Sequence, residues 1–170
     1  MADEAQNIYM DTCYLQAWIG KDEDAKKSVE PTIQKIKNSL TNPQIHVKVP
    51  MIVVGELINN LIKNRIGKFS EIIRDPNLLL EVLVPIRDLN ADLVPPSRES
   101  FNLVAKLLHA DERLEPTDSL ILAQVICDPD SSHFLTTDGL ILQSAKIKEL
   151  MKSPEIENKR KRKLRITAGF

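Results

Sequence analysis

Two aspartates stand where short apolar runs end. Asp11 closes the run at residues 7–11, and Asp138 closes the run at 133–138. Each run predicts a strand, so the two carboxylates meet at one sheet edge if the strands are neighbours. An aspartate after a strand is also a common turn or cap residue, so either position alone is compatible with a structural role.

Two further acids lie inside apolar helical patterns. Asp118 stands in the first turn of a predicted helix, with apolar residues three, four, seven and eight positions further on, so its carboxylate is expected to face inward. The alternative is an acid that only complements the helix dipole, worth about 0.3–1 kcal/mol. Glu56 lies beside Gly55 at the edge of the most apolar predicted helix. Its alternative is a rim glutamate whose charge reaches solvent.

Four converging carboxylates need a compensating positive charge. A single pair at about 4 Å costs about 4 kcal/mol at an effective dielectric near 20. The sequence has no His-Glu-x-x-His pattern, and His46, His109 and His133 are scattered, each expected to be structural or exposed. Oxygen ligands alone favour Mg²⁺ or Mn²⁺ over zinc. One or two such ions can hold a phosphodiester and lower the pKa of a bound water.

The elements that must position these acids alternate along the chain. Apolar and polar patterning predicts strands at residues 7–11, 45–49, 91–96, 133–138 and 164–169, and helices at 13–19, 25–40, 51–66, 98–110, 117–127 and 140–151. Gly67 is expected just beyond the third helix. Residues 68–90 predict one or two short helices interrupted at Pro76 and Pro85. In the helix at 98–110, a shared face is expected for Phe101, Val104, Ala105 and Leu108.

This alternation favours an α/β domain with a mainly parallel sheet, because parallel strands need crossover connections that helices supply. In such sheets, sites form at the carboxyl ends of the strands, where the strand order reverses. Asp11 and Asp138 are both predicted at such ends.

The acidic motifs together resemble those of PIN-domain nucleases, including VapC-type toxins. The runs IYMDTCYL, VVGEL, PTDSLILAQ and FLTTDG follow one another in the family's order across residues 7–142. The resemblance implies a PIN-like three-layer α/β/α fold with a mainly parallel, roughly five-stranded sheet. It also implies Mg²⁺- or Mn²⁺-dependent endonuclease action on RNA, and often a homodimer.

Site residues follow from the resemblance position by position. It makes Asp11 and Asp118 metal ligands, Asp138 a ligand directly or through water, and Glu56 a ligand or the group that orients the attacking water. Thr136 matches the hydroxyl residue of the last motif, and Thr12 is a weaker match. Family members often carry a further acid where this chain has Leu140, which puts a second metal site in doubt.

Composition and charge set the wider expectations. A chain of 170 residues with 42% hydrophobic residues predicts one compact domain. Cys13 and Cys127 predict reduced thiols, and no signal peptide or membrane span is recognisable, so a cytoplasmic protein is expected. We predict a PIN-like nuclease domain over residues 1–152 and a basic C-terminal tail over 153–170 that can end in an edge strand.

The basic charge is concentrated at the C-terminal end. Residues 151–170 hold seven basic and two acidic residues, which leaves a net charge of -6 for residues 1–150 given -1 for the whole chain. Such a run can neutralise phosphates of a nucleic acid. It can equally be a solvated tail.

Several functions therefore stay open. The first is an endoribonuclease, either a toxin blocked by an antitoxin protein or an RNA-processing enzyme. The second is a non-catalytic RNA-binding or assembly module, which the absence of an acid at Leu140 motivates. A phosphotransfer receiver is the least favoured, since Lys146 and Lys148 lie in a predicted helix rather than after the last strand.

Overall fold

The computed structural model describes residues 5–64 and 76–170. Five strands and the helices between them alternate along these residues. In chain order they are β1 Gln6–Met10, α1 Thr12–Ile19, α2 Glu23–Ser39, β2 Ile45–Pro50, α3 Met51–Asn64, α5 Pro76–Asp88, β3 Asp92–Val94, α6 Arg98–Ala110, α7 Pro116–Cys127, β4 Ser131–Leu135, α8 Gly139–Gln143, α9 Ala145–Met151, α10 Pro154–Glu157 and β5 Arg165–Thr167.

The five strands form one parallel sheet in the order β3-β2-β1-β4-β5. The chain builds the sheet outward from β1 to β3 and then returns to the other side of β1 with β4. The order therefore reverses between β1 and β4, which are the two strands that end in the predicted aspartates. The fold class expected from the alternating pattern is confirmed, with all strand pairs parallel.

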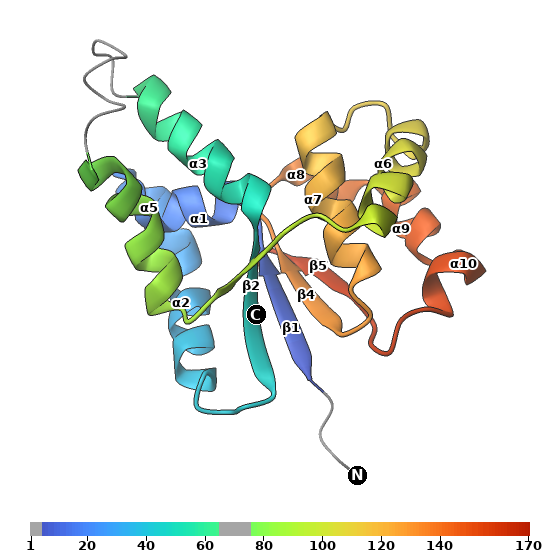
Figure 1. The fold of residues 1–170 in the computed structure, drawn as a ribbon, viewed down its shortest axis with the longest axis horizontal. Coiled ribbons are helices and arrows are strands. Elements are labelled where there is room, and N and C mark those ends of the chain that lie inside the picture. The colour runs from blue at the N-terminus through green and yellow to red at the C-terminus, as the bar shows by residue number, and fades with distance from the viewer. Residues whose placement is uncertain (1–4, 65–75) are drawn as a thin grey trace.

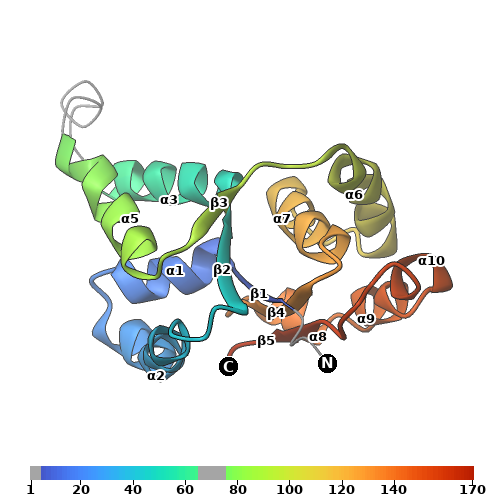
Figure 2. The ribbon, with the colours of Figure 1, turned by 60° about the horizontal axis from the view of Figure 1, so that its bottom comes forward.

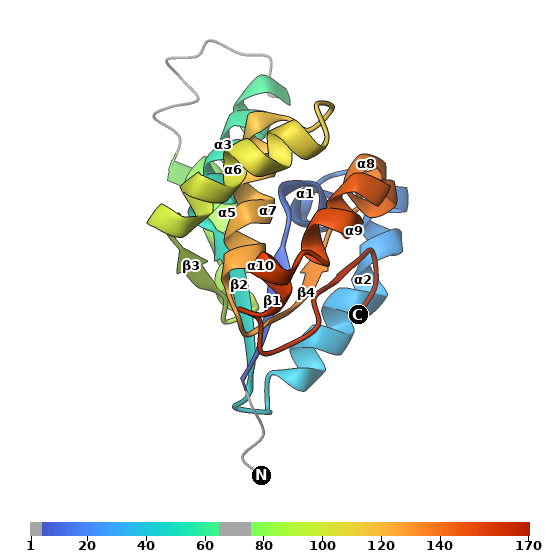
Figure 3. The ribbon, with the colours of Figure 1, turned by 90° about the vertical axis from the view of Figure 1, so that its right-hand side faces the viewer.

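Helices cover both faces of this sheet (Figures 1 and 2). Helices α1, α2, α3 and α5 lie on one face, and α6, α7, α9 and α10 lie on the other. In the side view this second group stands in front of the strands (Figure 3). Strand β1 is central, and Ile8, Tyr9 and Met10 are at most 2% exposed. A strand buried on both faces is what a covered parallel sheet requires.

A polar cluster anchors the end of α7 to the sheet. The Oδ2 atom of Asp128, just after α7, accepts hydrogen bonds of 2.8 Å each from Asn7 Nδ2, Tyr9 Oη and Lys48 Nζ. The three donors come from β1 and β2. The hydrogen-bonded ion pair with Lys48 holds the pKa of Asp128 below its usual range despite partial burial. The amino end of β4 is thereby fixed against β1.

Arg160 ties the C-terminal segment to the same region. Its Nη1 atom donates to the carbonyl oxygen of Ile126 at 3.0 Å, and Nη2 donates to the carbonyl oxygen of Ser131. Strand β5 then pairs with β4 at the edge of the sheet. The strand predicted within residues 164–169 is present.

The prediction for residues 68–90 needs correction. Helix α5 begins at Pro76 and continues through Pro85, so the predicted interruption at Pro85 is wrong. Proline removes one amide donor at a cost of about 3 kcal/mol. Burial of Val82, Ile86 and Leu89 on the stripe that passes Pro85, at roughly 1.5–3 kcal/mol each, offsets this cost. The predictions for Gly67 and for residues 68–75 lie outside the described residues.

The inward face of α6 also differs from the predicted one. Phe101 is 56% exposed and Ala105 is exposed, whereas Ser100, Leu103 and Leu107 are buried. Both stripes have helical spacing, and packing of α6 against α7 selects the second.

None of the helices within residues 5–64 and 76–170 combines the length and apolar character needed to cross a membrane.

Candidate metal centre

Asp11 is buried at the carboxyl end of β1 and also begins α1. It is 3% exposed, and its Oδ1 accepts the Thr12 amide at 2.7 Å. Its Oδ2 accepts the Thr136 hydroxyl at 2.7 Å and the Cys13 thiol at 3.2 Å. Burial raises the pKa of Asp11, although the hydrogen bonds from these three donors act to lower it. The carboxylate is therefore held in one orientation.

Thr136 joins the ends of β1, β4 and β5. Its hydroxyl donates to Asp11 and accepts the amide of Asp138 at 3.0 Å, while its own amide donates to the carbonyl oxygen of Thr167 at 3.1 Å. The side chain is fully buried. The predicted contact between Thr136 and a carboxylate is thus present, and it fixes the spacing of the two strand ends.

Asp138 follows β4 and begins α8. Its Oδ1 accepts the amides of Leu140 at 2.6 Å and Ile141 at 3.2 Å, which is an N-cap arrangement. Within the described residues, Oδ2 has no hydrogen-bond or ion-pair partner. The cap role that the sequence left open is therefore real, and it occupies one of the two carboxylate oxygens.

Glu56 lies in the layer of helices that contains α1, α2, α3 and α5 (Figure 1). It lies on α3, is partly exposed, and its Oε2 accepts a hydrogen bond from the Thr12 hydroxyl. Since the Thr12 amide donates to Asp11, one residue links the carboxylates of β1 and α3. Thr12, a weak candidate in the sequence, therefore contacts two of the four candidate carboxylates.

Asp118 completes the group from the first turn of α7. It is half-buried, and burial together with the negative charges of Asp11, Asp138, Glu56 and Glu115 raises its pKa to about 7. A carboxyl group with an ordinary pKa near 4 is fully charged at neutral pH. After burial, the charges of Asp11, Asp138 and Glu56 contribute to the raised pKa of Asp118, so the four predicted acids lie within electrostatic range of one another.

The chemistry of these side chains fits a divalent cation that prefers oxygen ligands, because every candidate ligand is a carboxylate. The charged groups of the described residues that shift the pKa of Asp118 are all acidic. In this conformation, no three or more His, Cys, Asp or Glu side chains of the described residues are close enough together to hold a metal ion. Ligation would therefore require some of these carboxylates to rotate inward. Glu56 and Asp138 are partly exposed and less constrained than Asp11.

A cavity of about 600 Å³ opens beside the acids. Cys13 and Thr137 form its wall next to Asp11, and residues of α1, α2 and α3 form much of the rest. Asn60 Nδ2 donates to Gln16 Oε1 across this cavity at 3.0 Å. None of the four acids lines this cavity, which adjoins Asp11 through the side chain of Cys13.

Comparison with known proteins addresses the fold. No protein-family model and no curated protein matches the chain. The chain is similar to a chain in the crystal structure of VapBC2 from Rickettsia felis bound to a DNA fragment from their promoter, with 13% identity over 94% of this chain and 98% of that chain, and a TM-score of 0.57. The chain has a PIN-like fold. At this identity the likeness establishes the fold alone.

Within the described residues, none of the three histidines has a hydrogen bond or ion pair with the four acids. His133, on β4, contacts the ring of Phe170 edge-on at 5.0 Å between centroids and lies within hydrogen-bond distance of Gln6 and Ser132. His46 and His109 are exposed. Their expected structural or exposed positions are confirmed.

The sequence reasoning missed two residues with structural contacts, one beside Asp11 and one at the start of the loop before Asp118. Cys13 was expected to be only a reduced thiol, but it also accepts the Thr137 amide at 3.2 Å and contacts Asp11. Its spacing of two residues from Asp11 is the signal that could have found it.

The second is buried Asp111, which binds the Arg113 guanidinium through two hydrogen bonds and accepts the Ser144 hydroxyl at 2.7 Å. Ser144 also caps α9, so the predicted helix at 140–151 is two helices. This network fixes the loop before Asp118 against the α8–α9 junction. Nothing in the sequence distinguishes Asp111 from an ordinary residue at a helix end.

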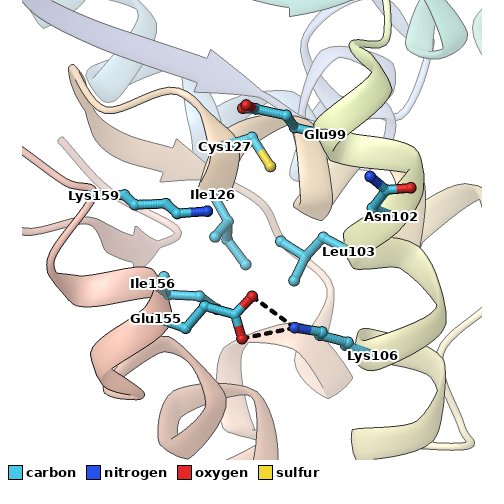
Figure 4. Close-up of a pocket in the computed structure, with 9 residues that line it drawn as sticks. All are labelled: Glu99, Asn102, Leu103, Lys106, Ile126, Cys127, Glu155, Ile156 and Lys159. Carbon is cyan, nitrogen blue, oxygen red and sulfur yellow. Dashed lines mark hydrogen bonds and ion pairs between the residues drawn. The ribbon is translucent and has the colours of Figure 1, made fainter.

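A separate pocket of about 190 Å³ lies between α6, α7 and α10 (Figure 4). Lys106 Nζ bonds both carboxylate oxygens of Glu155 at 2.7 Å across it, and the sulfur of Cys127 points toward it. None of the four acids lines this pocket, and burial raises the pKa of the Cys127 thiol. Cys127 is therefore a poor nucleophile and takes no part in the carboxylate site.

Proposed function

We propose that this chain is a divalent-metal-dependent endoribonuclease that uses Mg²⁺ or Mn²⁺ and hydrolyses RNA phosphodiesters at Asp11, Glu56, Asp118 and Asp138. The observation that carries the proposal is the hydrogen-bond network in which Thr136 and Thr12 join Asp11, Asp138 and Glu56 at the point where the strand order reverses. The pKa of Asp118, raised first by burial and then by the charges of these acids, supports it. An electrostatic arrangement of this kind is costly unless a cation neutralises it.

Each residue has a defined part in the proposed reaction. Asp11, held by three donors, provides the fixed ligand, and Thr136 maintains that orientation. Asp118 and the free oxygen of Asp138 approach from α7 and α8, and Glu56 binds the cation or orients the attacking water. A bound divalent cation would supply charge neutralisation for the phosphodiester and a more acidic water. Water attack predicts products with a 5′-phosphate and a 3′-hydroxyl.

The decisive experiment compares cleavage of labelled RNA by the wild type, Asp11→Asn and Asp118→Asn with Mg²⁺ or Mn²⁺ present. We expect both variants to fold and neither to cut. Asp92→Asn, which changes an exposed aspartate on β3, is the matched control and should cut normally. Full cleavage by either cluster variant would refute the proposal.

A toxin role, with an antitoxin protein as partner and a homodimer as the assembly, is the finer form of the proposal. It is supported by the likeness to a chain of VapBC2 and by the motif resemblance. RNA processing without an antitoxin uses the same chemistry, and both roles belong in the cytoplasm. A small protein encoded directly upstream that binds this chain and blocks cleavage would separate the toxin role from RNA processing.

The alternative is a non-catalytic RNA-binding or assembly module with a PIN fold. Two observations favour it: the described residues contain no preassembled group of three metal-binding side chains, and Leu140 replaces an acid that family members often carry. Calorimetric titration with Mn²⁺ discriminates between the two. If no binding is detected at about millimolar Mn²⁺, any metal affinity is weaker than that of typical oxygen-ligand sites. That result would favour the module.

A further inference from the structure

Asp111 is a buried carboxylate that has no part in the proposed reaction. It lies directly after α6, is 1% exposed, and binds the Arg113 guanidinium through hydrogen bonds of 2.8 and 2.7 Å. The hydrogen bonds from Arg113, and then the one from Ser144, hold the pKa of Asp111 below its usual range. A buried charge persists only where such partners compensate it. The place of Asp111 in the fold therefore depends on these two residues.

Ser144 provides the long-range partner of Asp111. It lies at the junction of α8 and α9, and its hydroxyl donates to Asp111 Oδ2 at 2.7 Å. The same hydroxyl accepts the Ile147 amide at 3.2 Å, and the Ser144 amide donates to the carbonyl oxygen of Leu140 at 2.9 Å. Ser144 is thus fixed to both helices, and its bond to Asp111 joins them to the end of α6, which also packs against α9.

Each end of this bond leads through a short hydrogen-bonded segment to an acid of the carboxylate site. On one side, the carbonyl oxygen of Asp111 accepts the Leu114 amide at 3.1 Å, and α7 follows with Asp118 in its first turn. On the other side, Asp138 begins α8 and Ser144 ends it. A helix rises about 1.5 Å per residue, so these two residues lie about 9 Å apart along α8. A shift of either segment would move its acid.

Asp118 and Asp138 need a restraint of this kind because their charges repel each other. Burial, and then the charges of acidic neighbours that include Asp138, raise the pKa of Asp118 to about 7. The Oδ1 atom of Asp138 accepts two amides of α8, so this carboxylate moves with its helix. Repulsion between the two acids would drive the starts of α7 and α8 apart unless other bonds hold them.

We propose that Asp111 and Ser144 are positioning residues of the carboxylate site, and that the hydrogen bond between them sets the spacing of Asp118 and Asp138. The inference rests on the proposed metal-dependent function, since this spacing decides how well the two acids share a divalent cation. Asp111 and Ser144 act through the backbone of α7 and α8 and are not proposed as ligands. Loss of their bond should weaken cation binding without removing a ligand.

The test uses two substitutions, each with a matched control. Ser144→Ala removes the donor to Asp111 together with the cap of α9, so its control is Ser97→Ala, which removes the cap of α6. Asp111→Asn removes a hydrogen-bonded charge, and Asp128→Asn removes another one beyond the far end of α7. Circular dichroism and urea denaturation identify a temperature at which all the variants are folded. If Asp111→Asn does not fold, Ser144→Ala carries the test.

Mn²⁺ affinity, measured by calorimetric titration, separates positioning from general stabilisation. The Kd should rise by at least about 3-fold in both test variants, less than the roughly 10–100-fold typical for loss of a direct partner of a metal ligand. The double variant should lose no more affinity than Asp111→Asn alone, because both changes remove one bond. Both controls should keep the wild-type Kd even where they are less stable. A wild-type Kd in the test variants, or an equal rise in the controls, would overturn the inference.

Hydrogen exchange in EDTA provides a readout that needs no metal. The amides of Arg113 and Leu114 bond to Asp111 and are distant from Ser144 in the sequence. In Ser144→Ala, the segment from Arg113 to Asp118 should exchange severalfold faster, whereas Ser97→Ala should leave it unchanged. Unchanged exchange in Ser144→Ala would contradict the inference. A wild type that binds no Mn²⁺ would instead count against the proposed function, and exchange would still decide whether Ser144 holds the segment that carries Asp118.

Discussion

Replacement of Asp118 by asparagine should make the metal-free protein more stable at neutral and basic pH. In the native state, burial and four acidic neighbours raise the pKa of Asp118 to about 7, whereas in the unfolded chain it returns to about 4. Between these values the native state retains a proton that the unfolded state has released. Stability is therefore lost as pH rises from about 4 to about 7 and stays lost above it. Asparagine does not titrate, so Asp118→Asn removes this loss.

The size of the effect follows from the same shift. A rise of about three pH units corresponds to roughly 4 kcal/mol at 1.36 kcal/mol per unit. Asp118 is only half-buried, so solvent screening reduces this figure, and we expect a gain of about 1–2 kcal/mol. For a domain of this size, such a gain corresponds to a rise in Tm of about 3–6 °C.

The assay is urea denaturation of wild type and Asp118→Asn in EDTA at several pH values between about 5 and 8, the window set by the raised pKa. The advantage of the variant should grow with pH and level off above about 7. Added Mg²⁺ should stabilise the wild type and leave the variant almost unchanged, which removes that advantage. Asp92→Asn, on an exposed edge strand, should follow the wild type throughout.

One outcome would refute the reasoning. If the wild type and Asp118→Asn show the same dependence of stability on pH, Asp118 does not ionise at an electrostatic cost. The four carboxylates would then lie too far apart to share a cation, and the proposed metal centre would lose its electrostatic support.

Two further substitutions test how the strand ends are held. Thr136→Val preserves the shape of the side chain but removes the donor to Asp11; it should lower stability by about 1–3 kcal/mol in urea denaturation and reduce the rate of RNA cleavage. Arg160→Gln removes several bonds to backbone carbonyls and should cost about 2–4 kcal/mol. Lys159→Gln, next to it and exposed, should change stability by less than about 0.5 kcal/mol; an equal loss in both variants would contradict the structural role of Arg160.

The local pattern was sufficient to predict most elements. Strands β1, β2 and β4 are short apolar segments between turn residues, and Ser97 begins α6 as its N-cap, with its side chain accepting the Ser100 amide. Caps and apolar periodicity depend on a few neighbouring residues, so they can be recognised without knowledge of the rest of the fold. The predictions failed where packing outweighed a local preference, as at Pro85 within α5 and on the inward face of α6.

The sequence by itself determined which acids could act together. Asp11 and Asp138 follow strands and Asp118 begins a helix, and a parallel sheet brings such positions to one edge because its strands share a direction. The motifs in their order therefore indicated the site as a set of residues.

Only the tertiary structure decided how those acids are held and what surrounds them. Hydrogen bonds from Thr136 to Asp11 and from Thr12 to Glu56 join residues 125 and 44 positions apart. The folding of the C-terminal segment likewise decides that Arg160 bonds the carbonyl oxygen of Ile126 and that Lys161 pairs with Asp130. Contacts between distant segments depend on the complete three-dimensional packing, and no pattern of neighbouring residues encodes them.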